Sequence, residues 1–375
     1  MTDRLGSGHR GYTGHVHRVG VEEELFVVDH RGRLVPEAEA VLAAHRDHDP
    51  EHPLEHELFL QQVELKTSAH AAPDALRDDL VARRVAAVDA ARSIGLDLVA
   101  VPVDVLGGDD PVVTPHPRYT RIVERFGELA RTTMVCGMHV HVEVGEDDAI
   151  RVIDTLRPWL PLLAALASNS PFTHGRDTRM ASWRGHLRDT WPSAGVVEPF
   201  GDRRSYRLLV EQAIASGAAI DEHMVYLDAR IATRYPTVEV RVADVCTEVD
   251  DALLVAELTR ALVATIVTER TDPGSWRIDV LRDAGWRARR DALDGTLFDP
   301  LSGTFVPATR ALDSLVTTVR AALRSAGTID RVEAGVHRLL TYGTGAVRQR
   351  AVAGDPPDLR AVMADLARRT DPRSR

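Results

Sequence analysis

Four short stretches of the sequence alternate aliphatic residues with charged or polar ones. They cover residues 21–28, 61–67, 138–144 and 237–243. Successive side chains of a β-strand leave opposite faces, so a period of two predicts half-buried strands of an antiparallel sheet. The polar sides carry glutamate, histidine and arginine, whereas an ordinary solvated face favours lysine, threonine and serine. The pattern therefore predicts a sheet with one aliphatic face and one face that gathers ionisable groups.

The ionisable face draws side chains from all four stretches. Glu22 and Glu24 share one side of the first stretch, and Glu23 falls on the opposite, aliphatic side. The other stretches add the following residues to the face: Glu64, His139, His141, Glu239 and Arg241. Glutamates two positions apart on a strand are about 7 Å apart at the backbone, and such close carboxylates repel each other unless cations bind between them. The face therefore predicts a divalent metal site. The alternative explanation of the pattern is that the four strands are unrelated and each has an ordinary solvent-exposed face.

The residue types on this face favour Mg²⁺ or Mn²⁺. Four glutamates offer hard oxygen ligands: Glu22, Glu24, Glu64 and Glu239. Mg²⁺ prefers such oxygens, and Mn²⁺ also tolerates an imidazole from His139 or His141. Zinc is the competing ion, because the two histidines together with Glu64 or Glu143 could form a three-ligand hydrolytic site. A zinc hydrolase needs only one or two carboxylates, so the surplus argues for Mg²⁺ or Mn²⁺.

Arg241 follows Glu239 by two positions and shares its face. Its planar guanidinium suits a forked contact with phosphate oxygens and could stabilise the charge of a transferred phosphoryl group. A structural ion pair is the alternative role. The chain has a single lysine, Lys66, and no G-x-x-x-x-G-K-[ST] motif. We therefore expect any nucleotide chemistry to depend on metal ions and arginine.

Composition limits the partners of the chain. Its 375 residues carry a formal net charge of −10, which disfavours nucleic acid and anionic membranes as partners. Residues 1–18 contain no apolar segment of the kind that secretory signals have, and Cys136 and Cys246 lie in no C-x-x-C motif. The most apolar run, residues 159–167, is too short to span a bilayer and predicts a buried helix. These features predict a cytoplasmic protein with reduced cysteines.

The order of patterns predicts one catalytic domain. Residues 1–18 are expected to form a flexible lead-in, and residues 19–370 a single domain that is helical toward its C-terminus. Residues 171–194 lack periodicity and predict a long, ordered, functional loop. Helices are predicted over residues 37–47, 73–94, 116–131, 147–167, 205–216 and 250–269. Two further strands are predicted over residues 97–103 and 225–232.

Eight segments, taken in order, carry a resemblance to a known family. They are G-V-E-E-E-L at 20–25, E-L-K-T at 64–67, G-M-H-V-H-V at 137–142, S-N-S-P-F at 168–172, A-S-W-R at 181–184, P-T-V-E-V-R at 236–241, W-R-A-R at 286–289 and Y-G-T-G-A at 342–346. Together they resemble the glutamate–cysteine ligase type 2 family of carboxylate–amine ligases, which is related in fold to glutamine synthetase. The resemblance spans nearly the whole chain.

The resemblance implies a fold and a division of roles. The fold would be α+β and like that of glutamine synthetase, with helices around a funnel of antiparallel β-sheet. ATP would enter one end of the funnel and a carboxylate substrate the other, with Mg²⁺ or Mn²⁺ between them. The implied metal ligands are Glu22, Glu24, Glu64, His139 and Glu239, with His141 as a further candidate. Arg241 would face the γ-phosphate, and Ser182 and Arg184 would face the carboxylate substrate.

The implied activity is ATP-dependent amide formation. A glutamate-type γ-carboxylate would be activated as an acyl phosphate, and cysteine or another amine would then displace phosphate. With glutamate and L-cysteine the product would be γ-glutamylcysteine. The family also suggests a homodimer. Two alternatives stay open, a zinc-dependent amidohydrolase and a non-catalytic relative that binds ATP or an amino acid.

Overall fold

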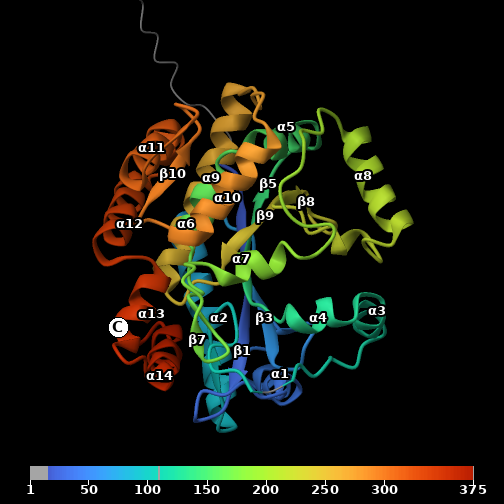
Figure 1. Ribbon diagram of the computed structural model, residues 1–375, viewed down its shortest axis with the longest axis vertical. Coiled ribbons are helices and arrows are strands. Elements are labelled where there is room, and N and C mark those ends of the chain that lie inside the picture. Colours follow the sequence, from blue (N-terminus) through green and yellow to red (C-terminus); the bar gives the residue numbers. More distant parts are fainter. Residues whose placement is uncertain (1–15, 109, 375) are drawn as a thin grey trace, which may run out of the picture.

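The computed structural model of the protein describes residues 16–108 and 110–374. At its centre lies a seven-stranded sheet in the order β2-β3-β1-β5-β9-β8, with β4 paired to the end of β1 (Figure 1). The strands are β1 (Val19–Val28), β2 (Glu55–His56), β3 (Gln62–Lys66), β4 (Asp97–Val99), β5 (Gly137–Glu143), β8 (Ala229–Ile231) and β9 (Thr237–Asp244). Every pair in this sheet is antiparallel. The four alternating stretches of the sequence thus form four neighbouring strands, β3, β1, β5 and β9.

Helices surround the sheet, and the chain beyond β9 is mainly helical. The helices before β9 are α1 (Ala38–His48), α2 (Pro73–Ser93), α3 (Pro117–Phe126), α4 (Glu128–Thr132), α5 (Glu146–Leu156), α6 (Leu160–Leu166), α7 (Trp183–Arg188), α8 (Arg203–Ser216) and the 3₁₀ turn η1 (Glu222–Met224). Those after it are α9 (Val249–Glu269), α10 (Ile278–Asp291), α11 (Ala308–Ser325), α12 (Ile329–Tyr342), α13 (Gly345–Ala353) and α14 (Leu359–Thr370). Two hairpins complete the fold, β6 (Phe172–Thr173) with β7 (Arg176–Asp177) and β10 (Thr296–Asp299) with β11 (Thr304–Pro307). The predicted α+β class is confirmed.

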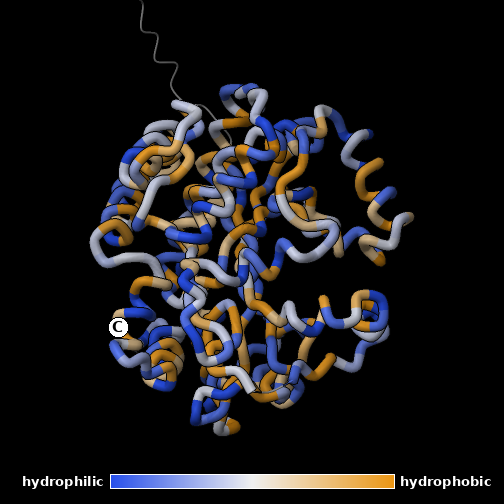
Figure 2. Tube along the Cα trace, viewed as in Figure 1, coloured by the Kyte–Doolittle hydropathy of each residue, from blue (hydrophilic) through white to orange (hydrophobic). Residues whose placement is uncertain are grey.

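The aliphatic face of the sheet is buried under helices. Val21, Leu25, Val63, Val140 and Val240 are each at most 1% exposed. Helices α2 and α9 pack on β1, and α6 packs on β9. Figure 2 shows hydrophobic residues interspersed with hydrophilic ones along the strands and along the helices around them. One cluster of buried residues extends from β1 to α14, so helices cover this face and the polar face is left for a cavity.

Strand register brings the polar residues together. Glu24 lies opposite Glu64 across the β1–β3 pair, and Glu22 lies opposite both Lys66 on β3 and His139 on β5. On the other side of β5, His141 pairs with Glu239 of β9. Because paired residues on one face of a sheet have Cβ atoms about 5 Å apart, the register alone gathers these ionisable groups.

Several predicted elements differ from the observed ones at glycine or proline. The helix predicted over residues 116–131 is divided at Gly127, whose φ is +55°. The helix predicted over residues 147–167 is divided into α5 and α6. Pro158 has no N–H to donate to the carbonyl of Asp154, and Nε of Arg157 bonds to that carbonyl at 3.0 Å instead. Each of the two predicted helices is therefore divided where the regular backbone hydrogen bonds of the helix cannot continue.

The remaining differences concern strands, the long loop and the chain start. The strands predicted over residues 97–103 and 225–232 are shorter, spanning Asp97–Val99 and Ala229–Ile231. The loop predicted over residues 171–194 contains the β6–β7 hairpin and α7. Most of the predicted lead-in, residues 1–15, lies outside the described residues. In the described part of the chain, no helix has the length and hydrophobicity needed to cross a membrane.

Candidate active site

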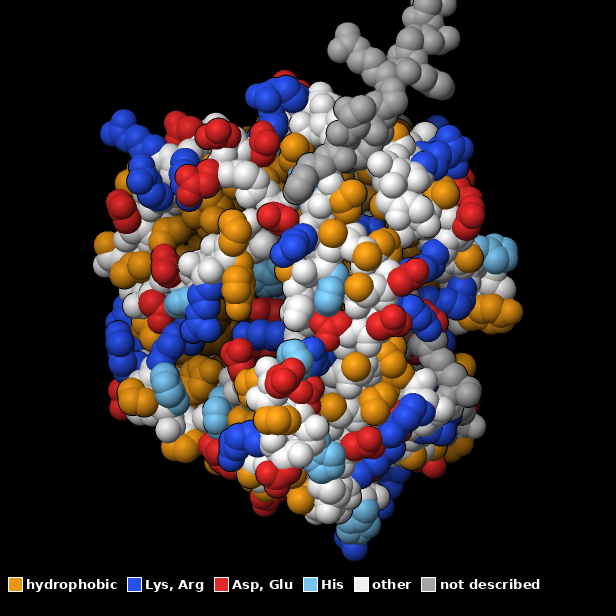
Figure 3. All heavy atoms as spheres, turned by 180° about the vertical axis from the view of Figure 1, so that it is seen from behind, with side chains coloured by type: hydrophobic (Ala, Val, Ile, Leu, Met, Phe, Trp, Pro, Cys, Tyr) orange, Lys and Arg blue, Asp and Glu red, His pale blue; other side chains and the backbone are white. Residues whose placement is uncertain are grey.

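A cavity of about 440 Å³ lies on the polar face of the sheet. Seen from behind, the molecule has a hollow in which acidic, basic and histidine side chains lie together (Figure 3). The cavity is lined by seven of the candidate residues from the alternating stretches: Glu22, Glu24, Glu64, His139, His141, Glu239 and Arg241. Glu143, the further zinc candidate, is not among the residues that line it. Strand alternation therefore predicted residues that the fold brings to one cavity, and their functional roles stay predictions.

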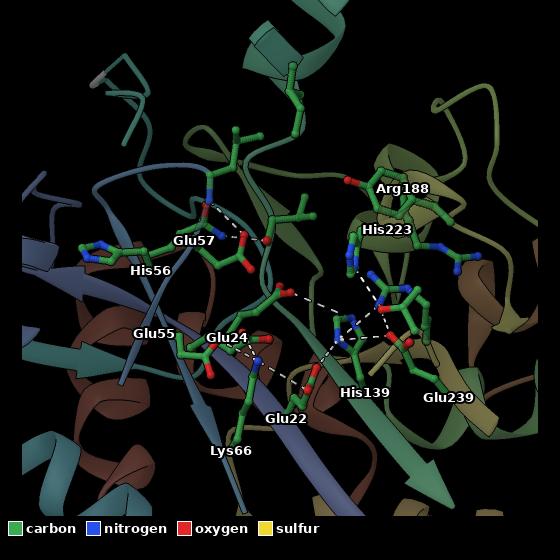
Figure 4. Close-up of a pocket in the computed structure, with 18 of the residues that line it drawn as sticks. Glu22, Glu24, Glu55, His56, Glu57, Lys66, His139, Arg188, His223 and Glu239 are labelled. Atoms are coloured by element: carbon green, nitrogen blue, oxygen red, sulfur yellow. Dashed lines mark hydrogen bonds and ion pairs between the residues drawn. The ribbon is translucent and has the colours of Figure 1, made fainter. Parts of the chain in front are cut away.

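Two groups of three side chains in the cavity could each hold a metal ion. One consists of Glu22, His139 and Glu239, and the other of Glu24, Glu64 and His139; within each group, one ligand atom per residue lies within 4.8 Å of the others. The imidazole of His139 lies between them (Figure 4), with Nδ1 at 3.4 Å from Glu22 and Nε2 at 3.8 Å from Glu24. Each ring nitrogen thus faces a different group. Nε2 is buried without a hydrogen-bond partner among the described residues.

The electrostatics of these groups suit a divalent cation. Burial, reinforced by the charge of Arg241, lowers the pKa of His139, so the imidazole is neutral and keeps a lone pair for a metal. Burial and repulsion by Glu22 and Glu57 raise the pKa of Glu64 well above its usual value. A bound cation would relieve this repulsion. The oxygen-rich donor sets fit Mg²⁺ or Mn²⁺.

The arrangement does not favour the two-histidine zinc site. Neither of the two groups found among the described residues contains His141. Its Nδ1 instead lies 3.1 Å from the hydroxyl of Thr237, and its Nε2 lies 3.5 Å from Glu22. A zinc hydrolase that relies on the His-x-His pair needs both imidazoles on one ion. Carboxylates dominate both groups here.

Arg241 and Arg230 hold Glu239 at the cavity wall. Arg230 makes a forked contact with its carboxylate, with Nε at 2.7 Å and Nη2 at 3.2 Å, and Arg241 also donates to it. Burial would raise the pKa of Glu239, but the two guanidinium charges outweigh it and lower the pKa. Arg241 also stacks on the ring of Tyr226, with 5.6 Å between Cζ and the ring centroid. Arg241 is thus an ion-pair partner that also lines the cavity, and its contact with a phosphate stays a prediction.

Ser182 and Arg184, which the family resemblance suggested, occupy different surroundings. The Ser182 hydroxyl donates to Asp244 at 2.8 Å and accepts from the backbone N–H of Gly185, which caps α7. Arg184, two residues on, lines the cavity. Its guanidinium passes so close to Gly137 that a Cβ there would lie 2.1 Å from Nη2. Ser182 therefore positions the helix that carries Arg184 to the cavity.

Sequence reasoning missed several cavity residues. Burial and the charge of Glu24 raise the pKa of Glu57 to about 7, which gives the cavity a further carboxylate. The run Glu-His-Glu at residues 55–57 just before β3 was its only sequence signal. Tyr119 on α3 and Tyr226 ahead of β8 also line the cavity. These aromatic residues belong to none of the four alternating stretches, so no pattern in the sequence singles them out.

Comparisons with known proteins agree on one family. Residues 18–355 match the family described as glutamate-cysteine ligase family 2. A protein of Nocardioides sp. named "Putative glutamate–cysteine ligase 2-1" is 42% identical over 370 residues, covering 95% of this chain and 96% of the relative. A "Putative glutamate–cysteine ligase 2" of Streptomyces coelicolor is 39% identical, covering 94% of this chain and 98% of the relative.

A solved structure shares the fold. The glutamate–cysteine ligase of Francisella tularensis in complex with AMP superimposes with a TM-score of 0.71, covering 96% of this chain and 90% of that one. The two sequences are 14% identical. At this identity the likeness concerns the fold alone.

Proposed function

The chain belongs to glutamate–cysteine ligase family 2 and is an ATP-dependent ligase, and we propose that it joins a glutamate-type carboxylate to an amine. The observation that carries this proposal is the cavity in which two groups of potential metal ligands share His139, next to Arg241. Phosphoryl transfer from ATP needs positive charge around the triphosphate, and a ligase without a P-loop must obtain it from metal ions and arginine.

Mg²⁺ or Mn²⁺ fits the donor atoms of this cavity. The proposed ligands are Glu22, Glu24, Glu64, His139 and Glu239. When bound, such an ion supplies positive charge that neutralises phosphate oxygens. The chain's own guanidinium groups, on Arg241 and Arg184, would neutralise the remaining charge on the phosphate and on the carboxylate substrate.

The proposed reaction has two steps. A γ-carboxylate oxygen of the acid attacks the γ-phosphorus of ATP, the bond to the bridging oxygen breaks, and ADP leaves an acyl phosphate behind. The amine nitrogen then attacks the carbonyl carbon, the bond to the phosphate oxygen breaks, and the amine loses a proton as inorganic phosphate departs. No covalent intermediate with the enzyme is needed.

Glutamate and L-cysteine are the first substrates to test, because the relatives' names contain both. The product would be γ-glutamylcysteine, and cytoplasmic ATP would supply the energy. We also propose, from the family resemblance, that the chain forms a homodimer. Neither the amidohydrolase nor the non-catalytic relative is favoured.

The test is phosphate release by the purified protein. The protein is incubated with ATP, glutamate and either Mg²⁺ or Mn²⁺. Cysteine and other amines are then offered in turn as acceptors, and the products are identified by mass. We expect phosphate release with an amide product, absent when nucleotide or metal is omitted. ATP left intact with every amine would overturn the proposal in favour of a binding protein, and hydrolysis of amides without nucleotide would indicate an amidohydrolase.

A further inference from the structure

We propose that Lys66 serves as a resident cation of the carboxylate cavity, filling a third cation position beside the two groups that share His139. By a resident cation we mean a side-chain ammonium, part of the protein itself, that neutralises and holds carboxylates as a metal ion would elsewhere in the cavity. The inference deepens the proposed function and rests on it, because it assumes that the two groups bind divalent ions.

Three carboxylates from three strands surround the Lys66 ammonium. Nζ lies 2.9 Å from Glu55, 3.1 Å from Glu64 and 3.6 Å from Glu22 (Figure 4). The three oxygens come from β2, β3 and β1, so they converge on Nζ as ligands converge on a hard cation. The Lys66 side chain is 25% exposed, so most of its surface is buried.

Glu22 joins this position to the neighbouring metal-type group. Its Oε1 faces Lys66, whereas its Oε2 lies 3.4 Å from Nδ1 of His139. Glu64 is likewise shared, since it bonds Lys66 and also belongs to the group with Glu24. Each shared carboxylate thus bridges the ammonium and a proposed metal position. Lys66 therefore holds both carboxylates in place before any metal arrives.

The residue type supports the same conclusion. Lys66 is the only lysine among the 46 lysine and arginine residues of the chain. A lysine ammonium is a compact point charge with three donors, so it can meet three separate carboxylates at once. A guanidinium is planar and wider, and its fork suits a single carboxylate. All the other residues of this count are arginines, and the single lysine lies at the position where a compact cation fits.

The positive charge of Lys66 also sets how many divalent ions the cavity takes. An ammonium among the same carboxylates excludes a third divalent ion and repels the two others through Coulomb forces that solvent only partly screens. Replacing Lys66 by alanine removes both the charge and the bulk. The cavity should then accept one more divalent ion and bind divalent ions more tightly.

The test counts Mn²⁺ ions by electron paramagnetic resonance at pH 8, with the intact chain. We expect two ions on the wild-type protein, three on Lys66→Ala, and an affinity at least about tenfold higher for the variant. Lys66→Arg retains the charge and should retain the count of two. Arg310→Ala removes one positive charge from the exposed face of α11 and is the matched control, with unchanged count and affinity.

The outcomes separate this inference from the proposed function. If Lys66→Ala binds the same number of ions as the wild type, within twofold in affinity, the resident-cation role is wrong and the ligase proposal stands. If the wild type binds no Mn²⁺ at all, the proposed metal sites fail and this inference fails with them.

A second measurement needs no variant and covers the case in which Lys66→Ala does not fold. Protein labelled with ¹³C-lysine gives a single lysine Cε resonance, because the chain has one lysine. We expect that resonance to stay distinct from free lysine when Mg²⁺ saturates the cavity. A shift to the free-lysine position would mean that Mg²⁺ displaces Lys66 from its carboxylates and would overturn the proposal.

Discussion

Three consecutive glutamates of β1 have two different environments because a strand sends neighbouring side chains to opposite faces. Glu22 and Glu24 line the cavity, whereas Glu23 is fully buried against α2. There both of its oxygens accept hydrogen bonds of 2.7 Å from Arg84, which also donates to the carbonyls of Cys246 and Thr247. A buried ion pair of this kind holds together only while both charges are present.

Substitution of two adjacent glutamates should therefore separate stability from activity. Glu24→Gln removes a carboxylate of the cavity and should lower kcat at least about a hundredfold with little change in Tm. Glu23→Gln leaves the buried charge of Arg84 without a counter-ion and should lower the free energy of unfolding by about 3–5 kcal/mol. Phosphate release per folded molecule and urea unfolding measure the two effects.

The same pair tests the strand assignment. Glu23→Gln protein that remains folded at low temperature should keep most of its turnover, because its side chain lies on the far face of the sheet. Comparable losses of turnover per folded molecule in the two variants would contradict this division of faces.

His186 on α7 should make stability depend on pH. Burial, together with the charge of Arg289, lowers the pKa of His186 to about 4. The unfolded chain binds this proton near pH 6.5, so the stabilisation is complete above pH 6.5 and is lost as the pH falls toward 4. The side chain is partly exposed, which limits the effect to about 1 kcal/mol. Urea unfolding between pH 4.5 and 7 measures it.

Replacing the imidazole isolates this contribution. His186→Gln should flatten the pH dependence of the free energy of unfolding relative to the wild type by that amount. His337→Gln, on the exposed face of α12, is the matched control and should leave the dependence unchanged. If the free energy of unfolding of His186→Gln fell with pH as steeply as that of the wild type, other groups would account for the loss of stability in acid.

At the residue scale, the sequence predicts those site members whose position follows from strand alternation. Glu64 and His139 are found in this way because alternation fixes their face and pairing fixes their neighbours. Glu57 is not predicted in this way, because it follows a strand of only two residues, which is too short to show a period. Ser182 was assigned through family resemblance, and its engagement with Asp244 becomes visible only once α7 packs against β9.

At the scale of elements, strands were easier to predict than the ends of helices. The alternating strands carry their own signal in every second residue. Helix breaks depend on one residue each, and at Arg157 the break is completed by a side chain that replaces a missing backbone donor. The hairpin and α7 within residues 171–194 are too short to leave a periodic pattern, so their order comes from tertiary contacts.

The break between α3 and α4 should depend on glycine. Gly127 has φ +55° and ψ −125°, a conformation that residues with a Cβ rarely adopt. Gly127→Ala should lower the free energy of unfolding by about 1–2 kcal/mol, although an added Cβ would meet no atom within 4 Å. Gly145→Ala, at φ −60° and equally free of neighbours, is the control and should cost about 0.5 kcal/mol. Equal costs would mean that backbone conformation is not the cause.

At the scale of the molecule, helices cover the aliphatic face of the sheet, and α3 and α7 contribute side chains to the cavity on the other face. Helices α2 and α9 bury one face of the sheet, and the other face keeps a cavity lined by carboxylates. The α+β class follows from the sequence because strands and helices have different periods. The full lining of the cavity does not follow, since Tyr119 and Tyr226 reach it from separate segments that only the complete fold brings together.

A cavity with this many acidic groups should make the stability of the whole molecule depend on metal. A ligand that binds only the folded state stabilises it by about 2.7 kcal/mol at a hundred times its Kd, which corresponds to at least about 3 °C in Tm. We therefore expect Mn²⁺ with a non-hydrolysable ATP analogue to raise Tm by this amount, and EDTA to reverse the rise. Glu64→Gln should abolish most of the shift, because Glu64 belongs to one proposed metal group and bonds Lys66 of the adjoining position. An equal shift in that variant would place the metal outside this cavity, because the loss of a buried ligand cannot leave the affinity of its own site unchanged.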